Sequence, residues 1–252
     1  MAAVISIANQ KGGVGKSTTA HALAVGLKRW HKRVLLIDLD PQCNTSYSTR
    51  AEAAHPTTYD LMTGRATAAE GIQATAQVDI VAASPLLSGA DMEQNKVGRE
   101  YKIREALQPI ASRYDYIVID TPPALGILTV NALTASDRVI IPTTADIFSI
   151  QGIGQLYATI DAVRTYSNKG LTLAGILLTK YSPQTVLARD LAETLEATAQ
   201  QIGTFVYRAY IREGVVVKEA QLSQQDIFTY APASNPGQDY LAFIGEFIKR
   251  GK

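Results

Sequence analysis

The chain has 252 residues, of which 46% are hydrophobic and 19% charged, and its formal net charge is +1. This composition excludes an intrinsically disordered chain, and a near-neutral chain would need a local basic patch to bind nucleic acid. The single cysteine, Cys43, excludes a disulfide framework and a cysteine-ligated metal site within one chain.

Neither a signal peptide nor a membrane span is expected. No basic stretch precedes an apolar one at the N-terminus. The longest uncharged candidate, Thr121–Ser136, is too short to span a bilayer and is interrupted by two prolines. We therefore expect a cytoplasmic protein.

Short runs of Val, Ile and Leu alternate with helical patterns along the whole chain. Several runs are continuously apolar, which is typical of strands buried on both faces of a parallel sheet. The predicted strands are, in chain order, Val4–Ala8, Val34–Asp38, Val78–Ala82, Tyr116–Asp120, Arg138–Pro142, Leu173–Leu178 and Thr204–Tyr207.

Between these runs, apolar residues recur at helical spacing. The four stripes are Ala20–Leu27, Ile153–Val163, Leu187–Ile202 and Tyr240–Ile248, and we expect short helices and loop over Arg50–Gly71. The alternation predicts an α/β fold, with a doubly wound, mostly parallel sheet flanked by helices. Because no linker or repeat interrupts the chain, we expect a single domain over residues 1–252.

The segment between the first strand and the first helix is rich in glycine and lysine. From Asn9 to Thr19 it reads Asn-Gln-Lys-Gly-Gly-Val-Gly-Lys-Ser-Thr-Thr. Glycines at such a junction let successive backbone N–H groups turn toward an anion at the helix N-terminus. Lys16 would contact the β- and γ-phosphates of a nucleotide, and the Ser17 hydroxyl would ligate Mg²⁺. The generic pattern needs glycine at position 10, where this chain has Gln10.

Two apolar runs end in aspartate, the residue that a nucleotide-hydrolysing site needs beside its phosphate loop. Asp120 ends one run, and we expect it to hold the Mg²⁺ shell; a helix cap or a solvated strand end is the alternative. Asp38 ends the other run, and Asp40 lies two residues on, so both side chains could address one site. Since Pro41 turns the chain out of the sheet, Asp40 would be free to orient the attacking water; a simple aspartate turn is the alternative.

These segments together resemble the ParA/MinD family of ATPases, which carry a deviant Walker A motif. Lys11–Ser17 is similar to that motif, Asp38–Gln42 to the segment called Walker A′, and Ile117–Pro123 to the Walker B region. The similarity covers most of the chain, more loosely after Pro142, and the C-terminal part resembles the short ParA/Soj-type partition ATPases. The resemblance implies a P-loop NTPase fold, Mg²⁺-dependent hydrolysis of ATP, and an ATP-dependent homodimer.

The resemblance also implies roles for single residues. Lys11 would be the signature lysine that reaches the phosphates held by the partner in the dimer. Asp40 would position the hydrolytic water, Asp38 would support the Mg²⁺ geometry, and Asp120 would hold Mg²⁺ through water. Ser17 would ligate Mg²⁺ directly, and the phosphates of ATP would be cradled by Gly12, Gly13, Val14, Gly15, Lys16, Ser17 and Thr18.

Partition ATPases of this family bind DNA non-specifically as ATP dimers, which implies nucleoid association and a ParB-like centromere-binding partner that stimulates hydrolysis. A DNA-binding patch would have to come from scattered basic residues, each of which is also explained as a solvated charge. The candidates are Arg189, Arg208, Arg212, Lys218, Lys249, Arg250 and Lys252.

Two alternative functions stay open at this point. One is a MinD-like, membrane-associated positioning ATPase. The stripe from Tyr240 to Ile248 is the only candidate anchor, and we expect it to pack on the sheet rather than on a membrane. The other is a scaffold that positions a cargo and uses the nucleotide only as a switch.

Overall fold

The structure is a computed structural model that describes residues 2–52, 54–89 and 98–251. A seven-stranded sheet in the order β3-β4-β2-β5-β1-β6-β7 runs through its centre. Its strands are parallel except β3, which pairs antiparallel with β4. They are β1 (Ala3–Ile7), β2 (Val34–Asp38), β3 (Gln73–Ala74), β4 (Asp79–Val81), β5 (Tyr116–Asp120), β6 (Arg138–Thr143) and β7 (Thr172–Leu178).

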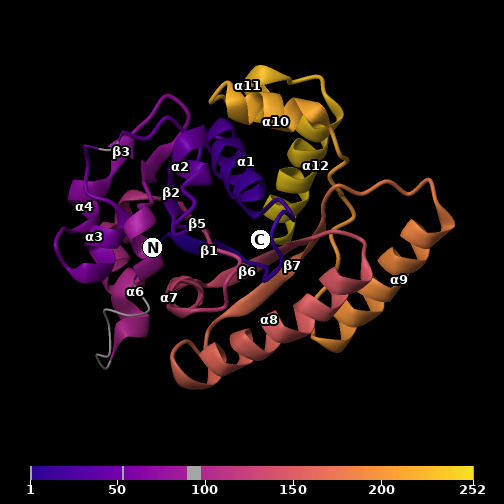
Figure 1. Ribbon diagram of the computed structural model, residues 1–252, viewed down its shortest axis with the longest axis horizontal. Coiled ribbons are helices and arrows are strands. Elements are labelled where there is room, and N and C mark those ends of the chain that lie inside the picture. Colours follow the sequence, from indigo (N-terminus) through magenta and orange to yellow (C-terminus); the bar gives the residue numbers. More distant parts are fainter. Residues whose placement is uncertain (1, 53, 90–97, 252) are drawn as a thin grey trace.

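Helices cover both faces of this sheet (Figure 1). They are α1 (Lys16–Arg29), α2 (Asn44–Ser48), α3 (Thr58–Thr63), α4 (Ala68–Gly71), α6 (Lys102–Leu107), α7 (Ile127–Ala135), α8 (Ile147–Tyr166), α9 (Val186–Gln201), α10 (Val215–Leu222), α11 (Ile227–Tyr230) and α12 (Asn235–Arg250). Short 3₁₀ turns lie at Pro85–Gly89, Arg99–Tyr101 and Gln108–Arg113. The predicted fold class is confirmed.

The sheet divides the hydrophobic core into two parts, one on each of its faces. Alternate strand residues such as Ile5, Leu36 and Val118 pack under α1 and α12 on one face. On the other face, two clusters lie against α3, α6 and α7 and against α8 and α9. Because both faces are buried, the strands read as continuous apolar runs instead of alternating ones.

The predicted strand ends agree with the structure to within one residue, with one exception. The expected strand Thr204–Tyr207 is wrong: only Val206 pairs with β7, in an isolated bridge to Ile176. The rings of Phe205 and Tyr207 instead pack against each other, with centroids 5.1 Å apart, over Gly175. The run therefore makes two backbone hydrogen bonds to Ile176, at 2.8 and 2.9 Å, and its aromatic residues pack over Gly175, but it does not continue as a strand.

The stripe predicted over Leu187–Ile202 forms α9, but only part of it is buried. Leu195 and Ala199 are fully buried, whereas Leu187 is 68% exposed. Figure 1 shows α9 at the outer edge of the molecule, beside the edge strand β7. No element of the described chain therefore covers the first turn of α9, although its residue pattern is that of a packed helix.

The apolar stripe of α12 packs inside the protein, as expected. Its buried residues pack with α1 on the same face of the sheet. They are Tyr240, Phe243, Ile244 and Phe247. None of the helices in the described part of the chain is long and apolar enough to span a membrane. Because a helix near the C-terminus packs on the first helix of the chain, we propose that residues 1–252 form one domain.

Candidate functional site

The glycine-rich loop joins β1 to α1 at the carboxyl edge of the sheet. Gly13 and Gly15 have φ values of +75° and +84°, a region that side chains with a Cβ rarely adopt. Gly15 is also the N-cap of α1, where no side chain caps the helix and no acidic residue lies in the first turn. The first N–H groups of α1 are therefore free to bind an anion.

Lys16, the first residue of α1, is almost completely buried at the base of this loop. Its ammonium group donates a hydrogen bond to the Lys11 carbonyl at 3.1 Å. Burial lowers the pKa of Lys16, and the nearby carboxylates of Asp120 and Asp40 act in the opposite direction. Lys16 is thus a confined positive charge near two carboxylates, and it has no direct ion pair within the described residues.

Asp38 and Asp120 lie side by side at the ends of neighbouring strands. They are register partners in the parallel pair β2–β5, and both are fully buried. Asp120 Oδ2 accepts a hydrogen bond from the Thr45 hydroxyl at 2.6 Å. Asp120 Oδ1 has no hydrogen-bond partner in the described chain. This orphaned acceptor lies next to a second carboxylate.

Asp38 organises the loop that follows β2. Its Oδ1 accepts from the backbone N–H of Asp40 at 3.0 Å, and its Oδ2 accepts from the backbone and the hydroxyl of Ser46 at 2.8 and 2.7 Å. Asp40 Oδ1 in turn accepts from the backbone N–H of Gln42 at 3.0 Å. Asp38 therefore holds the turn, and the Asp40 side chain lines the cavity above the phosphate loop.

The electrostatics of this corner suit a bound cation. Burial and then Asp38 raise the pKa of Asp120, and burial raises that of Asp38. Burial, followed by the charges of Asp38 and Asp40, also raises the pKa of the Cys43 thiol to about 11. The Ser17 hydroxyl lies close enough to Asp120 to lower its pKa. A hydroxyl and an unpartnered carboxylate oxygen in a negative field are ligands that Mg²⁺ prefers, so the residues present fit this ion.

Lys11 is not among the residues that line the cavity above the glycine-rich loop. Its ammonium group forms an ion pair with Asp146 at 2.6 Å and also donates to the Ser149 hydroxyl at 3.2 Å. Both residues belong to the start of α8. Lys11 is therefore held within its own chain, on the side of the loop toward α8.

A cavity of about 680 Å³ lies above the phosphate loop. Seven of the predicted site residues line it: Gly12, Gly13, Gly15, Lys16, Ser17, Thr18 and Asp40. Val14 is buried, and its carbonyl accepts from the Thr179 hydroxyl at 2.8 Å. The structure thus brings most of the predicted residues to one cavity and leaves Asp38 and Asp120 buried next to it.

Sequence reasoning missed the opposite wall of this cavity. That wall is formed by Thr179 and Lys180 after β7, by the segment from Ile211 to Gly214, and by α10. Arg212 anchors it through a bidentate ion pair with Asp239, at 2.9 and 2.6 Å. Gln221 on α10 donates to the Thr18 hydroxyl at 3.0 Å. The sequence of Arg212–Lys218 resembles the ends of short partition ATPases, but only the tertiary structure shows that this segment lines the cavity.

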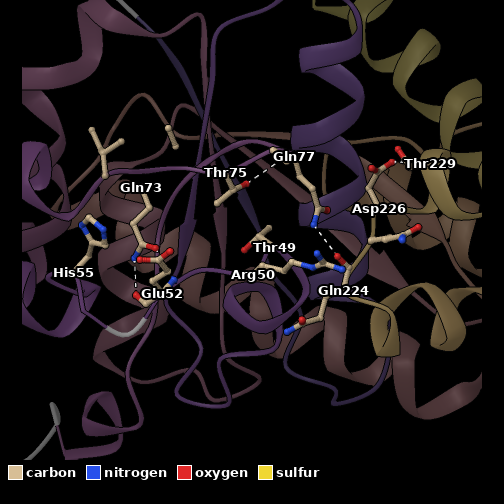
Figure 2. A pocket seen from close by; sticks show the side chains of 14 residues that line it. Thr49, Arg50, Glu52, His55, Gln73, Thr75, Gln77, Gln224, Asp226 and Thr229 are labelled. Atoms are coloured by element: carbon tan, nitrogen blue, oxygen red, sulfur yellow. Dashed lines mark hydrogen bonds between the residues drawn. The ribbon is translucent and has the colours of Figure 1, made fainter.

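A second, polar cavity of about 620 Å³ lies beside the edge strand β3 (Figure 2). Gln77 links three segments there, because its amide donates to the carbonyls of Ser48 and Gln224 at 2.9 and 3.1 Å. The Gln77 side-chain oxygen accepts a hydrogen bond from Nε2 of the buried His21 ring on α1, at 2.7 Å. This network fastens the end of α2, and with it the loop of Asp40, to α1 and to the connection between α10 and α11.

Comparison with known proteins agrees with this geometry. Residues 2–173 match the protein family described as "AAA domain". The chain is 36% identical to the sporulation initiation inhibitor protein Soj of Bacillus subtilis, covering 100% of both chains. It is also 36% identical to the chromosome partitioning protein ParA of Myxococcus xanthus, covering 98% of this chain and 88% of that protein. The chain belongs to the ParA/MinD family of ATPases.

A solved structure extends the likeness to the whole ParA/MinD-type fold. A protein described as cobyrinic acid a,c-diamide synthase of Mycobacterium smegmatis, with bound ADP and magnesium, has a TM-score of 0.85 at 29% identity. The match covers 100% of this chain and 97% of that one. The family resemblance predicted from the three motifs is therefore confirmed.

Proposed function

We propose that this ParA/MinD-family ATPase is a partition ATPase of the ParA type that hydrolyses ATP to ADP and phosphate with Mg²⁺. The observation that carries the proposal is the uncapped N-terminus of α1, with Lys16 at its base, facing the unpartnered Asp120 Oδ1. The relatives named Soj and ParA support partition as the process, and the neighbour with bound ADP and magnesium supports the cofactors.

Each group then has a defined task. The backbone N–H groups of residues 12–18 would bind the phosphates, and Lys16 would neutralise the charge that develops on the γ-phosphate. Ser17 would ligate Mg²⁺ directly and Asp120 through water. When bound, Mg²⁺ would supply charge neutralisation at the β- and γ-phosphates. Asp40, held over the cavity by the turn that Asp38 organises, would orient the attacking water.

The dimer and its ligands form the second part of the proposal. Two ATP molecules that face each other repel unless cations lie between them, and Lys11 would supply these cations in an ATP-bound homodimer. The dimer would bind DNA non-specifically and associate with the nucleoid. A ParB-like centromere-binding protein would stimulate hydrolysis and release.

The structure reduces the set of basic residues available to DNA. Arg212 and Arg250 are paired with Asp239 and Glu246 and are thus used within the fold. Lys252 lies outside the described residues. Among the predicted candidates in the described chain, those without a carboxylate partner are Arg189, Arg208, Lys218 and Lys249.

The nucleotide site is tested by calorimetry with ATP and Mg²⁺. Lys16→Ala should abolish measurable ATP binding, because it removes the buried charge from the phosphate loop. Lys28→Ala, at the far and exposed end of the same helix, is the matched control and should bind normally. Retention of ATP affinity by Lys16→Ala would refute the site.

DNA binding is tested by retention of non-specific duplex DNA with ATP present. Arg189→Glu and Lys218→Glu should weaken retention and flatten its salt dependence, since each removes a cation that would contact phosphate. Lys169→Glu, in the loop between α8 and the amino end of β7, lies away from the carboxyl ends of the strands and should leave retention unchanged. Equal losses in all three variants would mean that the effect is one of net charge alone.

The same ATP-bound protein, mixed with anionic liposomes, tests the MinD-like alternative. The apolar face of α12 is buried against α1 and is not available to a lipid surface. We therefore expect co-sedimentation with DNA and not with liposomes, and co-sedimentation with liposomes alone would contradict the partition function. Single-turnover hydrolysis that stays negligible with the partner would favour the scaffold alternative.

A further inference from the structure

The ion pair between Lys11 and Asp146 joins two segments 135 residues apart in the sequence. Asp146 is the N-cap of α8, and its Oδ1 accepts from the backbone N–H of Ser149 at 3.0 Å. Its Oδ2 accepts from three donors: the Thr144 hydroxyl at 2.5 Å, the Ser149 hydroxyl at 2.8 Å and the Lys11 ammonium group at 2.6 Å. One carboxylate therefore caps a helix and binds the lysine.

This carboxylate is well prepared to bind a cation. Burial would raise the pKa of Asp146, but the hydrogen bonds from Lys11, Thr144 and Ser149 outweigh burial and hold it well below its usual range. The three hydroxyl and backbone donors fix its orientation whether or not Lys11 is present. It is thus a preformed acceptor for a lysine side chain.

The main chain of Lys11 is also held at the same place. Its N–H donates to Asn9 Oδ1 at 3.0 Å, and the Asn9 amide donates to the Pro142 carbonyl at 2.7 Å. Its carbonyl accepts from Lys16 at 3.1 Å. The two lysines of the phosphate loop are therefore coupled, because phosphates that draw Lys16 into the cavity would take this hydrogen bond from Lys11.

The pair nevertheless remains accessible. The side chains of Lys11 and Asp146 are 37% and 34% exposed. An exposed ion pair of this kind contributes little stability, so a phosphate group of higher charge can displace the carboxylate. The next two residues of α8, Ile147 and Phe148, are 52% and 72% exposed, so the turn that holds Lys11 lies at the surface.

We propose that Asp146 is a positioning residue that holds Lys11 within its own chain and competes with the phosphates of a second copy for it. The proposal rests on the proposed function, in which Lys11 acts across the dimer. Formation of each ATP dimer then requires the release of two lysines from two Asp146 side chains. Asp146 thereby opposes dimer formation by the free energy of two exposed ion pairs.

The test is the dimer dissociation constant with saturating ATP and Mg²⁺, measured by analytical ultracentrifugation. An Asp40→Ala background keeps ATP intact during the measurement. Asp146→Asn removes the charge but keeps an N-cap of equal quality, because asparagine and aspartate cap helices similarly well. Loss of an exposed ion pair should favour release by about 2- to 5-fold per lysine, and therefore tighten the dimer by about 4- to 25-fold.

A double-mutant cycle with Lys11→Ala separates this effect from a change in the fold of α8. In the Lys11→Ala background, Asp146→Asn should leave the dissociation constant unchanged, since the lysine through which it acts is absent. Asp161→Asn, exposed on the same helix, removes an equal charge and should have no effect in either background. Ser149→Ala removes one donor to Asp146 and one contact of Lys11, and should tighten the dimer by a smaller factor.

The outcomes distinguish the two proposals. If Lys11→Ala dimerises as tightly as its parent, the proposed action of Lys11 across the dimer fails, and the role of Asp146 fails with it. Only the role of Asp146 is overturned if Lys11→Ala weakens the dimer but Asp146→Asn does not tighten it. The same holds if Asp146→Asn changes the dissociation constant equally with Lys11 present and in the Lys11→Ala background.

Discussion

Replacing Asp120 by asparagine should stabilise the nucleotide-free protein at pH 8 and at the same time abolish the stabilisation by ATP and Mg²⁺. Asp120 and Asp38 are buried register partners on adjacent strands, and Asp120 Oδ1 has no partner in the described chain. Without a cation, this arrangement places two carboxylates side by side away from water, which is unfavourable.

The size of the gain follows from this geometry. Register partners on adjacent strands lie about 5 Å apart, and two like charges at that distance repel by about 3 kcal/mol at an effective dielectric constant of about 20. Asparagine removes this repulsion, and its carbonyl oxygen can still accept the hydrogen bond from Thr45. A gain of about 2–3 kcal/mol corresponds to a rise in melting temperature of about 5–10 °C for a domain of this size.

The gain should depend on pH in one direction. Burial and Asp38 raise the pKa of Asp120 in the folded protein above its value in the unfolded chain, so folding takes up a proton. The carboxyl group therefore costs stability as the pH rises from its unfolded pKa through its folded pKa, and the cost shrinks as the pH falls. The difference between Asp120→Asn and the parent protein should be larger at pH 8 than at pH 5.

Thermal unfolding followed by circular dichroism, with and without ATP and Mg²⁺, measures both effects. Asp161→Asn, on the exposed face of α8, is the control and should change neither. The reasoning is refuted if Asp120→Asn melts below the parent protein at pH 8 without nucleotide, or if ATP and Mg²⁺ raise its melting temperature as much as that of the parent.

Three further predictions concern turnover, packing and the second cavity. Asp40→Ala should bind ATP normally in calorimetry but hydrolyse it about 10²- to 10⁴-fold more slowly, and normal turnover would exclude its water-positioning role. Gly175→Ala should lower the free energy of unfolding in urea by about 2–4 kcal/mol, because φ at Gly175 is +126° and a Cβ there would lie 2.6 Å from the Tyr207 ring. The control is Gly245→Ala, which has open space around the added Cβ and should not be destabilised. Gln77→Ala should lose about 1–3 kcal/mol, since it leaves the His21 ring unpaired, and unchanged stability would contradict the bridging role of Gln77 (Figure 2).

Local sequence patterns account for most of the fold. Continuous apolar runs predicted six strands to within a residue, because a strand buried on both faces is mostly apolar. The same reasoning failed for Thr204–Tyr207, where the rings of Phe205 and Tyr207 pack over Gly175 on β7. It also missed β3, since two residues carry no periodicity.

The sequence by itself determined the phosphate loop, because glycines between a strand and a helix favour the positive φ values that Gly13 and Gly15 adopt. It also determined that Asp38 and Asp120 end their strands at the same edge of the sheet. Only the tertiary structure decided that Asp120 Oδ1 has no hydrogen-bond partner among the described residues and that Lys11 binds Asp146. It also decided which distant segment closes the nucleotide cavity. The physical reason is that these contacts join residues far apart in the chain, which no local pattern of residue types records.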